Sequence, residues 1–192
     1  MAARSQLIVS FVGLMGTGKS TVARVLAERV GWSYVDLDDA IEAAFGQSIN
    51  DIFQQHGEGE FRAIEARVLT DTLATHDRIV LATGGGAACQ PGAMARLRGA
   101  GPVVWLDVPP PLLVARAQSD ARPLLAGRSA HEAESFLATQ LTNRRPFYAA
   151  ADHHVDASRA LEEVVDEVAR LVASLLTPTP QEDTDGADGS AR

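Results

Sequence analysis

Residues 13–20 read Gly-Leu-Met-Gly-Thr-Gly-Lys-Ser and match the phosphate-binding pattern G-x-x-x-x-G-K-S in full. The glycines let successive backbone N–H groups turn inward around a phosphate, and Lys19 is the only lysine among 17 basic residues. Such a loop joins a buried strand to a helix, and residues 7–12 and 21–30 have the composition of that strand and that helix. The motif predicts binding of a nucleoside triphosphate, with the Ser20 hydroxyl placed to ligate Mg²⁺. A glycine-rich turn that binds nothing is the alternative.

Apolar stretches of strand length alternate along the chain with stretches of helical periodicity. The predicted strands cover residues 7–12, 34–37, 79–82 and 103–106, with a short fifth strand near 154–155. The predicted helices cover residues 21–30, 49–56, 58–74, 94–98, 112–117, 132–141 and 161–175. This alternation indicates an α/β fold of three layers, in which helices cover both faces of a five-stranded parallel sheet. Ligands of such sheets bind beyond the carboxyl ends of the strands.

Size and charge restrict the classes of function. The chain has 192 residues, enough for one domain with a substantial core, and its net charge of −8 argues against a nucleic-acid partner. No apolar run reaches the roughly 18 residues that span a bilayer, and no N-terminal signal pattern is recognisable. The single cysteine, Cys89, excludes an intrachain disulfide framework. We expect a cytoplasmic protein without a membrane partner, and a monomer, because no long amphipathic seam is left unaccounted for.

The composition also predicts the domain boundaries. Residues 177–192 contain no large apolar side chain and are predicted to form a disordered acidic tail behind a single domain of residues 1–176. Within that domain, residues 116–130 combine Arg116, Arg122 and Arg128 with a proline and a glycine. This composition is typical of a mobile lid that brings positive charge over a transferring phosphoryl group.

Carboxylates follow two of the predicted strands. Asp36 and Asp38 would share one face if the strand continued through them, and two carboxylates beside a triphosphate are costly unless a cation or a hydroxyl satisfies them. We expect Asp36 to face the Mg²⁺ shell through water and Asp38 to accept a hydrogen bond from a substrate hydroxyl. The alternative is a solvated turn in which Asp39 caps the next helix. Asp107, at the end of another strand, is a rival for the metal, unless it only shapes the proline-rich turn that follows.

Glycines and arginines complete the set of candidate site residues. Gly84, Gly85 and Gly86 follow the third strand, where they let the backbone approach a ligand closely; the alternative is a tight turn. Arg62, held by Glu65 three residues later, and Arg144 would together suit an anionic small molecule, because guanidinium groups bind carboxylates in pairs of hydrogen bonds. For each arginine alone, a surface ion pair is the alternative. The helix that carries Arg144 is expected to end before Pro146.

Taken in order, these motifs resemble those of the shikimate kinase family over residues 7–175, nearly the whole predicted domain. The phosphate loop alone is common to many families, whereas the ordered set is far more specific. Leu37 replaces the commoner threonine, Trp105 stands where tyrosine is usual, and the acidic tail has no recognisable counterpart. The matching segments are residues 13–21, 36–38, 48–53, 57–65, 84–87, 122–125 and 144–148.

The resemblance implies transfer of the γ-phosphoryl group of ATP to the 3-hydroxyl group of shikimate, with Mg²⁺ as cofactor. Catalysis would rest on Lys19, on Asp38 and on the lid arginine Arg122. On chemical grounds Asp38 needs no large pKa shift for this role, because a loose transition state requires the proton to be removed late. The implied ATP-binding residues are Gly16, Thr17, Gly18, Lys19, Ser20, Thr21, Arg116, Arg122 and Arg159. The implied metal residues are Ser20 and Asp36, and the implied shikimate-binding residues are Asp38, Arg62, Gly84, Gly85, Gly86 and Arg144.

Two other functions remain compatible with the sequence. One is a kinase for another small acceptor, such as gluconate or a nucleoside monophosphate, although nothing indicates a pocket for the base of a second nucleotide. The other is a nucleotide-binding module without an acceptor, which the full set of strand-end and lid residues disfavours.

Overall fold

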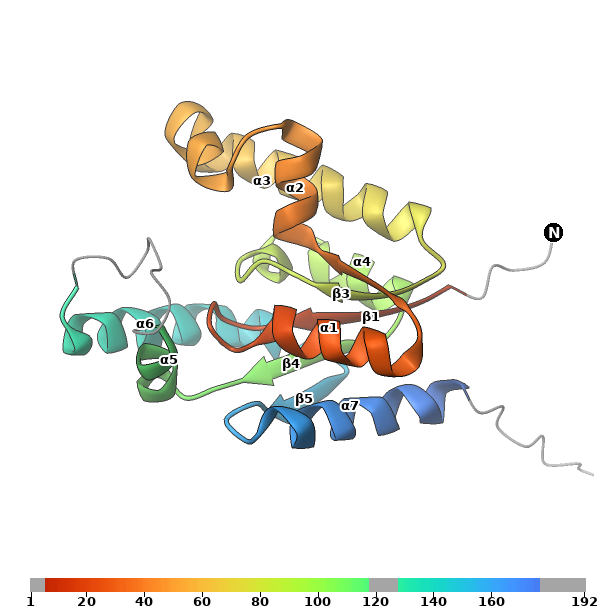
Figure 1. The fold of residues 1–192 in the computed structure, drawn as a ribbon. Helices are drawn as coiled ribbons and strands as arrows, with labels where there is room; N and C mark the ends of the chain where they lie inside the picture. The colour runs from red at the N-terminus through yellow and green to blue at the C-terminus, as the bar shows by residue number, and fades with distance from the viewer. Residues whose placement is uncertain (1–5, 118–127, 177–192) are drawn as a thin grey trace, which may run out of the picture.

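The computed structural model describes residues 6–117 and 128–176 and contains one sheet of five parallel strands in the order β2-β3-β1-β4-β5 (Figure 1). The α/β fold predicted from the alternation of strands and helices is therefore confirmed. Each strand was predicted to within one residue at either end. The strands are β1 (Leu7–Val12), β2 (Ser33–Asp36), β3 (Arg78–Ala82), β4 (Val103–Asp107) and β5 (His153–Asp156).

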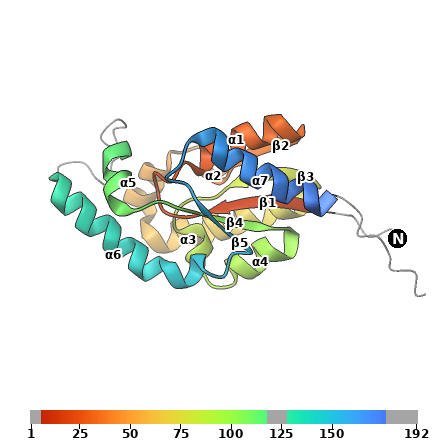
Figure 2. The ribbon, with the colours of Figure 1, turned by 90° about the horizontal axis from the view of Figure 1, so that it is seen from below.

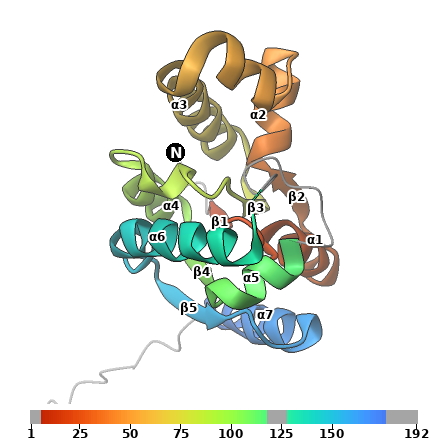
Figure 3. The same cartoon turned by 90° about the vertical axis from the view of Figure 1, so that its left-hand side faces the viewer.

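Helices cover both faces of the sheet, which gives the expected three layers. Helices α1 and α7 lie side by side on one face, and α4 and α6 lie on the other (Figures 2 and 3). Helix α2 and the first half of α3 lie beyond the β2 edge, at the top of Figure 1. The helices are α1 (Lys19–Val30), α2 (Leu37–Phe45), α3 (Ile49–Thr75), α4 (Ala93–Ala100), α5 (Pro110–Ala117), α6 (Ala130–Tyr148), α7 (Leu161–Leu176) and the 3₁₀ turn η1 (Ala87–Cys89).

Strand β1 forms the centre of the core and positions the phosphate loop. Ile8, Val9, Phe11 and Val12 are fully buried, as expected for a parallel strand covered on both faces. The chain crosses from β1 to β2 and β3 on one side, and then to β4 and β5 on the other. Because the direction of the crossovers reverses beside β1, a crevice forms at the carboxyl end of this strand. The phosphate loop begins there.

Helix α2 was not predicted, and its presence changes the positions of the aspartates. The strand ends at Asp36, whose side chain accepts a hydrogen bond from the Asp38 backbone N–H and so caps the helix. The prediction that Asp36 and Asp38 could lie on one face of a strand is therefore wrong, since Asp38 lies in the first turn of α2. Asp36 rather than Asp39 provides the cap.

Helix α3 contains the break that the sequence predicted at Gly57, whereas helix α6 continues past its predicted end at Pro146. Ser48 caps α3 as predicted, and a break at Gly57, with φ of 77°, separates the segments that correspond to the predicted helices of residues 49–56 and 58–74. Helix α6, in contrast, continues through Pro146 to Tyr148. Proline removes one helical hydrogen bond there, and the fully buried Tyr148 side chain fixes the last turn.

Two predicted features lie wholly or partly outside the described residues. Of the predicted lid, residues 116, 117 and 128–130 are described, so Arg122 lies outside, and the predicted tail of residues 177–192 is outside as well. Among residues 6–117 and 128–176, no helix is both long enough and apolar enough to cross a bilayer.

Candidate active site

The phosphate loop folds back on itself around the Lys19 side chain. The Lys19 ammonium donates hydrogen bonds to the carbonyl oxygens of Gly13 and Leu14, at 3.0 Å and 2.8 Å. Gly13 has a φ of 141°, and a Cβ atom there would lie 2.5 Å from the Leu106 carbonyl oxygen of β4, so no other residue fits. The loop leads directly into α1, whose N-terminal N–H groups favour an anion.

Ser20 and Asp36 meet at the side of this loop that faces β2. The Ser20 hydroxyl donates to Asp36 Oδ2 over 2.7 Å, and the Tyr34 hydroxyl donates to the same oxygen over 3.0 Å. Tyr34 was missed by the sequence analysis, although its position two residues before Asp36 puts both side chains on one face of β2. A hydroxyl and a carboxylate that border phosphate space form a donor set that suits Mg²⁺, which binds through few protein oxygens and completes its shell with water and phosphate.

The space in front of Ser20 and Asp36 is a cavity of about 190 Å³, which we call the phosphate cavity. It is lined by loop and strand-end residues that the sequence analysis had selected, together with Met15 and Thr83, which it had not. The lining residues are Met15, Gly16, Gly18, Lys19, Ser20, Thr21, Asp36, Asp38, Thr83, Gly84 and Gly85.

Asp38 borders the phosphate cavity and carries a perturbed carboxyl group. Burial, the nearby Asp36 carboxylate and, to a lesser extent, Glu65 raise the pKa of Asp38 from 3.8 to about 6, while Lys19 opposes the shift. A hydroxyl partner needs no large pKa shift on chemical grounds, but the fold imposes one on Asp38. The physical cause of this pKa shift is the crowding of negative charge in a partly desolvated space, and a bound cation would relieve that crowding.

A second cavity of about 280 Å³, which we call the arginine cavity, opens beside the first. Arg62 donates to Glu65 over 2.7 Å, and Glu65 is only 2% exposed. Burial raises the pKa of Glu65, and the Arg62 guanidinium offsets this rise only in part. The ion pair holds the arginine in place. Arg144 enters from α6 and donates to the Gly85 carbonyl over 3.1 Å. The two arginines that the sequence suggested thus line one cavity.

Close packing explains two of the three glycines that follow β3. A Cβ atom on Gly84 would lie 2.7 Å from Asp38 Oδ1, and a Cβ atom on Gly86 would lie 2.7 Å from Arg62 Nη2. Side chains at these positions would displace Asp38 and Arg62, which are expected to contact the hydroxyl and the carboxylate of a substrate. The glycines therefore leave room for Asp38 and Arg62 to line the cavity.

An apolar wall of the arginine cavity was missed by the sequence analysis. It consists of Met15, Ile49, Phe53 and Phe61, and the rings of Phe53 and Phe61 lie with their centroids 4.4 Å apart. In the sequence these residues have the spacing of ordinary core positions, so no pattern distinguishes lining from core. The wall suits the carbon atoms of a small ring whose acid group is bound by the arginines of the same cavity.

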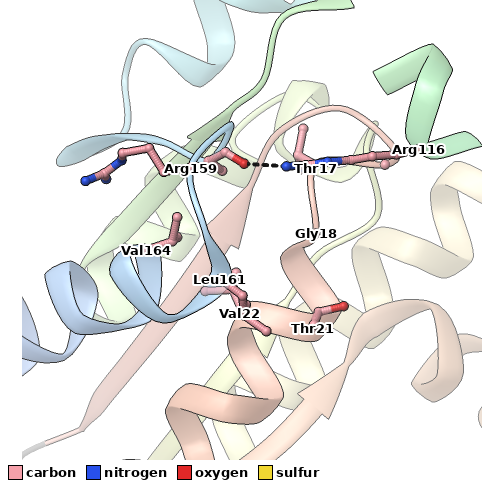
Figure 4. Close-up of a pocket in the computed structure, with 10 residues that line it drawn as sticks. Thr17, Gly18, Thr21, Val22, Arg116, Arg159, Leu161 and Val164 are labelled. Atoms are coloured by element: carbon pink, nitrogen blue, oxygen red, sulfur yellow. Dashed lines mark hydrogen bonds between the residues drawn. The ribbon is translucent and has the colours of Figure 1, made fainter. Parts of the chain in front are cut away.

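A third cavity of about 300 Å³ lies on the other side of the phosphate loop (Figure 4). Arg116 and Arg159 line it, as the resemblance implied, and Val22, Leu161 and Val164 add apolar surface that the sequence analysis did not identify. The Arg116 guanidinium donates to the Ala157 carbonyl over 2.9 Å, which joins α5 to the turn after β5. A flat base beside apolar side chains and a guanidinium plane is the ligand that such a cavity suits.

Asp107, the rival for the metal, is engaged elsewhere. Its carboxylate lies 3.2 Å from His154 Nε2 and 3.7 Å from Arg145 Nη2, and it is not among the residues that line the phosphate cavity. The Arg145 guanidinium lies over the Trp105 ring, 5.2 Å from its centroid. Arg145 therefore contributes to the packing of α6 on β4, whereas its neighbour Arg144 lines the arginine cavity.

Comparisons with known proteins agree with this geometry. A sequence model of the family described as shikimate kinase matches residues 15–173. Shikimate kinase of Synechococcus sp. is 41% identical over 177 residues, which is 91% of this chain and 86% of that protein. Shikimate kinase of Geobacter sulfurreducens is 42% identical over 166 residues, which is 85% of this chain and 90% of that protein.

Solved structures give the same result. The structure of shikimate kinase from Acinetobacter baumannii in complex with shikimate has a TM-score of 0.82 and 33% identity, over 91% of this chain and 97% of that one. A gluconokinase from Sinorhizobium meliloti has a TM-score of 0.54 at 20% identity over 89% of this chain and 93% of that one, and thus shares the fold alone. The match to the family model and the identity to these relatives show that the chain belongs to the shikimate kinase family.

Proposed function

We propose that this chain transfers the γ-phosphoryl group of ATP to the 3-hydroxyl group of shikimate. Membership of the shikimate kinase family makes it an ATP-dependent kinase that phosphorylates a hydroxyl of shikimate. The observation that carries the assignment of the site is that the phosphate cavity and the arginine cavity share Met15, Asp38, Gly84 and Gly85. A phosphate donor in one and an acidic acceptor in the other would therefore meet beside the Asp38 carboxyl group.

On the donor side, we assign the triphosphate to the phosphate loop and the base to the cavity lined by Arg116 and Arg159. Backbone N–H groups of residues 16–21 and the Lys19 ammonium would bind the phosphates once Lys19 leaves the Gly13 and Leu14 carbonyls. Ser20 and Asp36 would hold Mg²⁺, which when bound neutralises charge on the phosphate oxygens. Arg122 is assigned to the transferring phosphoryl group on the family resemblance alone.

On the acceptor side, Arg62 and Arg144 would bind the carboxylate and the apolar wall would pack against the ring. Both arginines line one cavity of about 280 Å³ together with the apolar wall, a lining that suits a small acidic ring. Gly84, Gly85 and Gly86 would form the floor beneath the ring. This arrangement favours shikimate over a neutral acceptor, since only an acid would gain charge-assisted hydrogen bonds from the two guanidinium groups.

In the reaction, the acceptor oxygen attacks the γ-phosphorus while the bond to the β-phosphate oxygen breaks and ADP leaves. The hydroxyl proton passes to the Asp38 carboxylate and from there to solvent. In the apo protein the pKa of about 6 already leaves Asp38 mostly ionised at neutral pH, and a bound cation would favour the ionised form further, so a carboxylate is present to accept the proton. Asp38 therefore serves both to orient the hydroxyl and to accept its proton, while most of the rate enhancement comes from positioning and charge neutralisation.

The proposal extends to the state of the protein in solution and in the cell. We propose a cytoplasmic monomer that acts on two small molecules, without a nucleic-acid or membrane partner, in accord with the net charge of −8. Light scattering coupled to size-exclusion chromatography measures the oligomeric state, and the mass of a dimer would contradict this part of the proposal.

Release of ADP with and without an acceptor tests the proposed function. We expect Mg²⁺-dependent ADP release only when shikimate is present, and equimolar formation of the 3-phosphate ester by phosphorus NMR. Equal turnover with gluconate would indicate a kinase of broader specificity. Nucleotide binding without turnover on any acceptor would indicate a binding module instead.

A further inference from the structure

Tyr148 is a buried residue at the end of α6 that none of the steps above uses. Its side chain is fully buried, and its ring lies 5.9 Å from that of Trp105. Its hydroxyl donates a hydrogen bond of 2.5 Å to the carbonyl oxygen of Gly85. A buried phenol is usually hydrogen-bonded, but the partner here is the backbone of the loop that forms the floor of the site.

The Gly85 carbonyl is also the partner of Arg144. Nη1 of Arg144 donates to it over 3.1 Å, so one oxygen accepts from two side chains of α6. Arg144 and Tyr148 lie four residues apart and therefore on the same face of the helix. The bond to Gly85 occupies one edge of the guanidinium and orients the remaining N–H groups, which are then available for a carboxylate.

Gly85 itself is held tightly between the two cavities. A Cβ atom on Gly85 would lie 3.2 Å from the Met15 backbone nitrogen and 3.6 Å from the Gly13 carbonyl oxygen. The phosphate loop and the Arg144 side chain of α6 therefore both pack against Gly85. A shift of the Gly85 carbonyl would therefore move the Arg144 guanidinium relative to the phosphate donor.

From this arrangement, which rests on the proposed function, we propose that Tyr148 is a positioning residue for shikimate. By fixing the Gly85 carbonyl, its hydroxyl holds Arg144 at the orientation that binds the substrate carboxylate. Burial also raises the pKa of Tyr148. The phenol therefore remains protonated, and a hydrogen-bond donor, throughout the physiological range of pH.

Tyr148→Phe tests the proposal, because it removes the hydroxyl and keeps the ring packed against Trp105. We expect KM for shikimate to rise roughly three- to tenfold, as for the loss of one buried hydrogen bond, with KM for ATP unchanged. Phe147→Ala is the matched control, since Phe147 lies in the same turn and is 44% exposed. The control should leave both KM values unchanged.

A double-mutant cycle with Arg144→Ala separates positioning from packing. If Tyr148 acts through Arg144, adding Tyr148→Phe to Arg144→Ala should raise KM for shikimate no further. Additive effects, an equal rise of both KM values, or a control as impaired as Tyr148→Phe would each overturn the positioning role. Absence of shikimate-dependent turnover in the unaltered chain would instead contradict the proposed function, so the two failures are distinguishable.

Discussion

Asp38 has a carboxyl group that the folded protein holds in an unfavourable environment for its charge. Burial is the main cause, and the Asp36 carboxylate adds to it, so the pKa rises from 3.8 to about 6. The protonated form therefore stabilises the folded state fully below about pH 4, and this contribution is lost as the pH rises through about 6. At neutral pH the ionised group destabilises the apo protein, which is a common cost of an active-site charge.

Asp38→Asn should consequently stabilise the apo protein while it abolishes phosphoryl transfer. The change of pKa corresponds to roughly 2 to 3 kcal/mol, so we expect a gain of about 2 kcal/mol at pH 7.5 and little gain at pH 4. Urea unfolding at the two pH values measures this difference, with Asp39→Asn as a control on an exposed neighbour. An equal gain at both pH values would contradict the account, and so would retained turnover.

Lys19 provides a second test at the scale of a single residue. In the apo protein its ammonium donates hydrogen bonds to the carbonyl oxygens of Gly13 and Leu14, and ATP would replace these acceptors with phosphate oxygens. Lys19→Met should reduce kcat/KM by at least about a hundredfold, or roughly 3 kcal/mol, with the fold intact by circular dichroism. Lys19→Arg keeps the charge and should also fail, because a planar fork does not fit the tight loop. Normal turnover in either variant would remove Lys19 from the reaction.

The sequence was sufficient to identify most charged residues of the site but not their surroundings. Lys19, Arg62 and Arg144 stand in motifs whose spacing is fixed by chemistry, and the structure brings all three to adjoining cavities. The pKa of Asp38 could not be predicted, because it depends on how closely Asp36 and Glu65 approach in space. The apolar wall around Phe53 was missed for a related reason, since core and lining residues look alike in a sequence.

At the scale of elements, the loop of Gly84, Gly85 and Gly86 connects β3 to both sides of the site. Gly86 has a φ of −103°, which any residue can adopt, so its lack of a side chain is explained by contact rather than by backbone strain. The contact is with the end of the Arg62 side chain, which can move. A substitution there should therefore affect substrate binding more than folding.

Gly86→Ala should raise KM for shikimate at least about tenfold, because the new Cβ atom displaces the Arg62 guanidinium. Gly59→Ala is the matched control: Gly59 lies in α3, and a Cβ atom there meets nothing within 4 Å. We expect the control to retain full activity and to gain about 0.5 to 1 kcal/mol of stability from its helical position. Steady-state kinetics and thermal unfolding of both variants check these expectations, and an unaffected KM in Gly86→Ala would contradict them.

The sequence analysis failed to predict helix α2 and the true end of helix α6, because capping and tertiary packing determine where these helices begin and end. Helix α2 was missed because the strand was extended past Asp36 to Leu37, although Asp36 before the helix and Gly46 after it, with φ of 72°, are typical end signals. Helix α6 continues beyond Pro146 because the Tyr148 hydroxyl is hydrogen-bonded to the Gly85 carbonyl, and these two residues are far apart in the sequence. The strands were predicted well, because a buried parallel strand has an almost continuous apolar sequence.

At the scale of the whole molecule, the reversal of crossovers beside β1 brings the three cavities to one end of the sheet. The predicted site residues are spread over some 140 positions, from Gly16 to Arg159, yet those described lie beyond the carboxyl ends of the strands. We propose that the domain responsible for this ends at Leu176, the last residue of α7. The predicted tail would then contribute nothing to catalysis.

Truncation after Leu176 tests this boundary. We expect unchanged kcat, unchanged KM for both substrates and an unfolding midpoint within about 1 °C of that of the full chain, because residues 177–192 lack apolar side chains to bury. Kinetics and calorimetry of the two forms provide the measurement. A loss of activity or stability on truncation would show that the tail belongs to the functional unit.

The central claim is that ATP and shikimate bind in adjoining cavities that meet at Asp38. A crystal structure with shikimate, Mg²⁺ and a non-hydrolysable ATP analogue tests it most directly. We expect the β- and γ-phosphates within hydrogen-bond distance of Lys19, the carboxylate between Arg62 and Arg144, and the 3-hydroxyl beside Asp38 in line with the γ-phosphorus. An empty phosphate loop, or a shikimate ring bound away from the two arginines, would contradict the account.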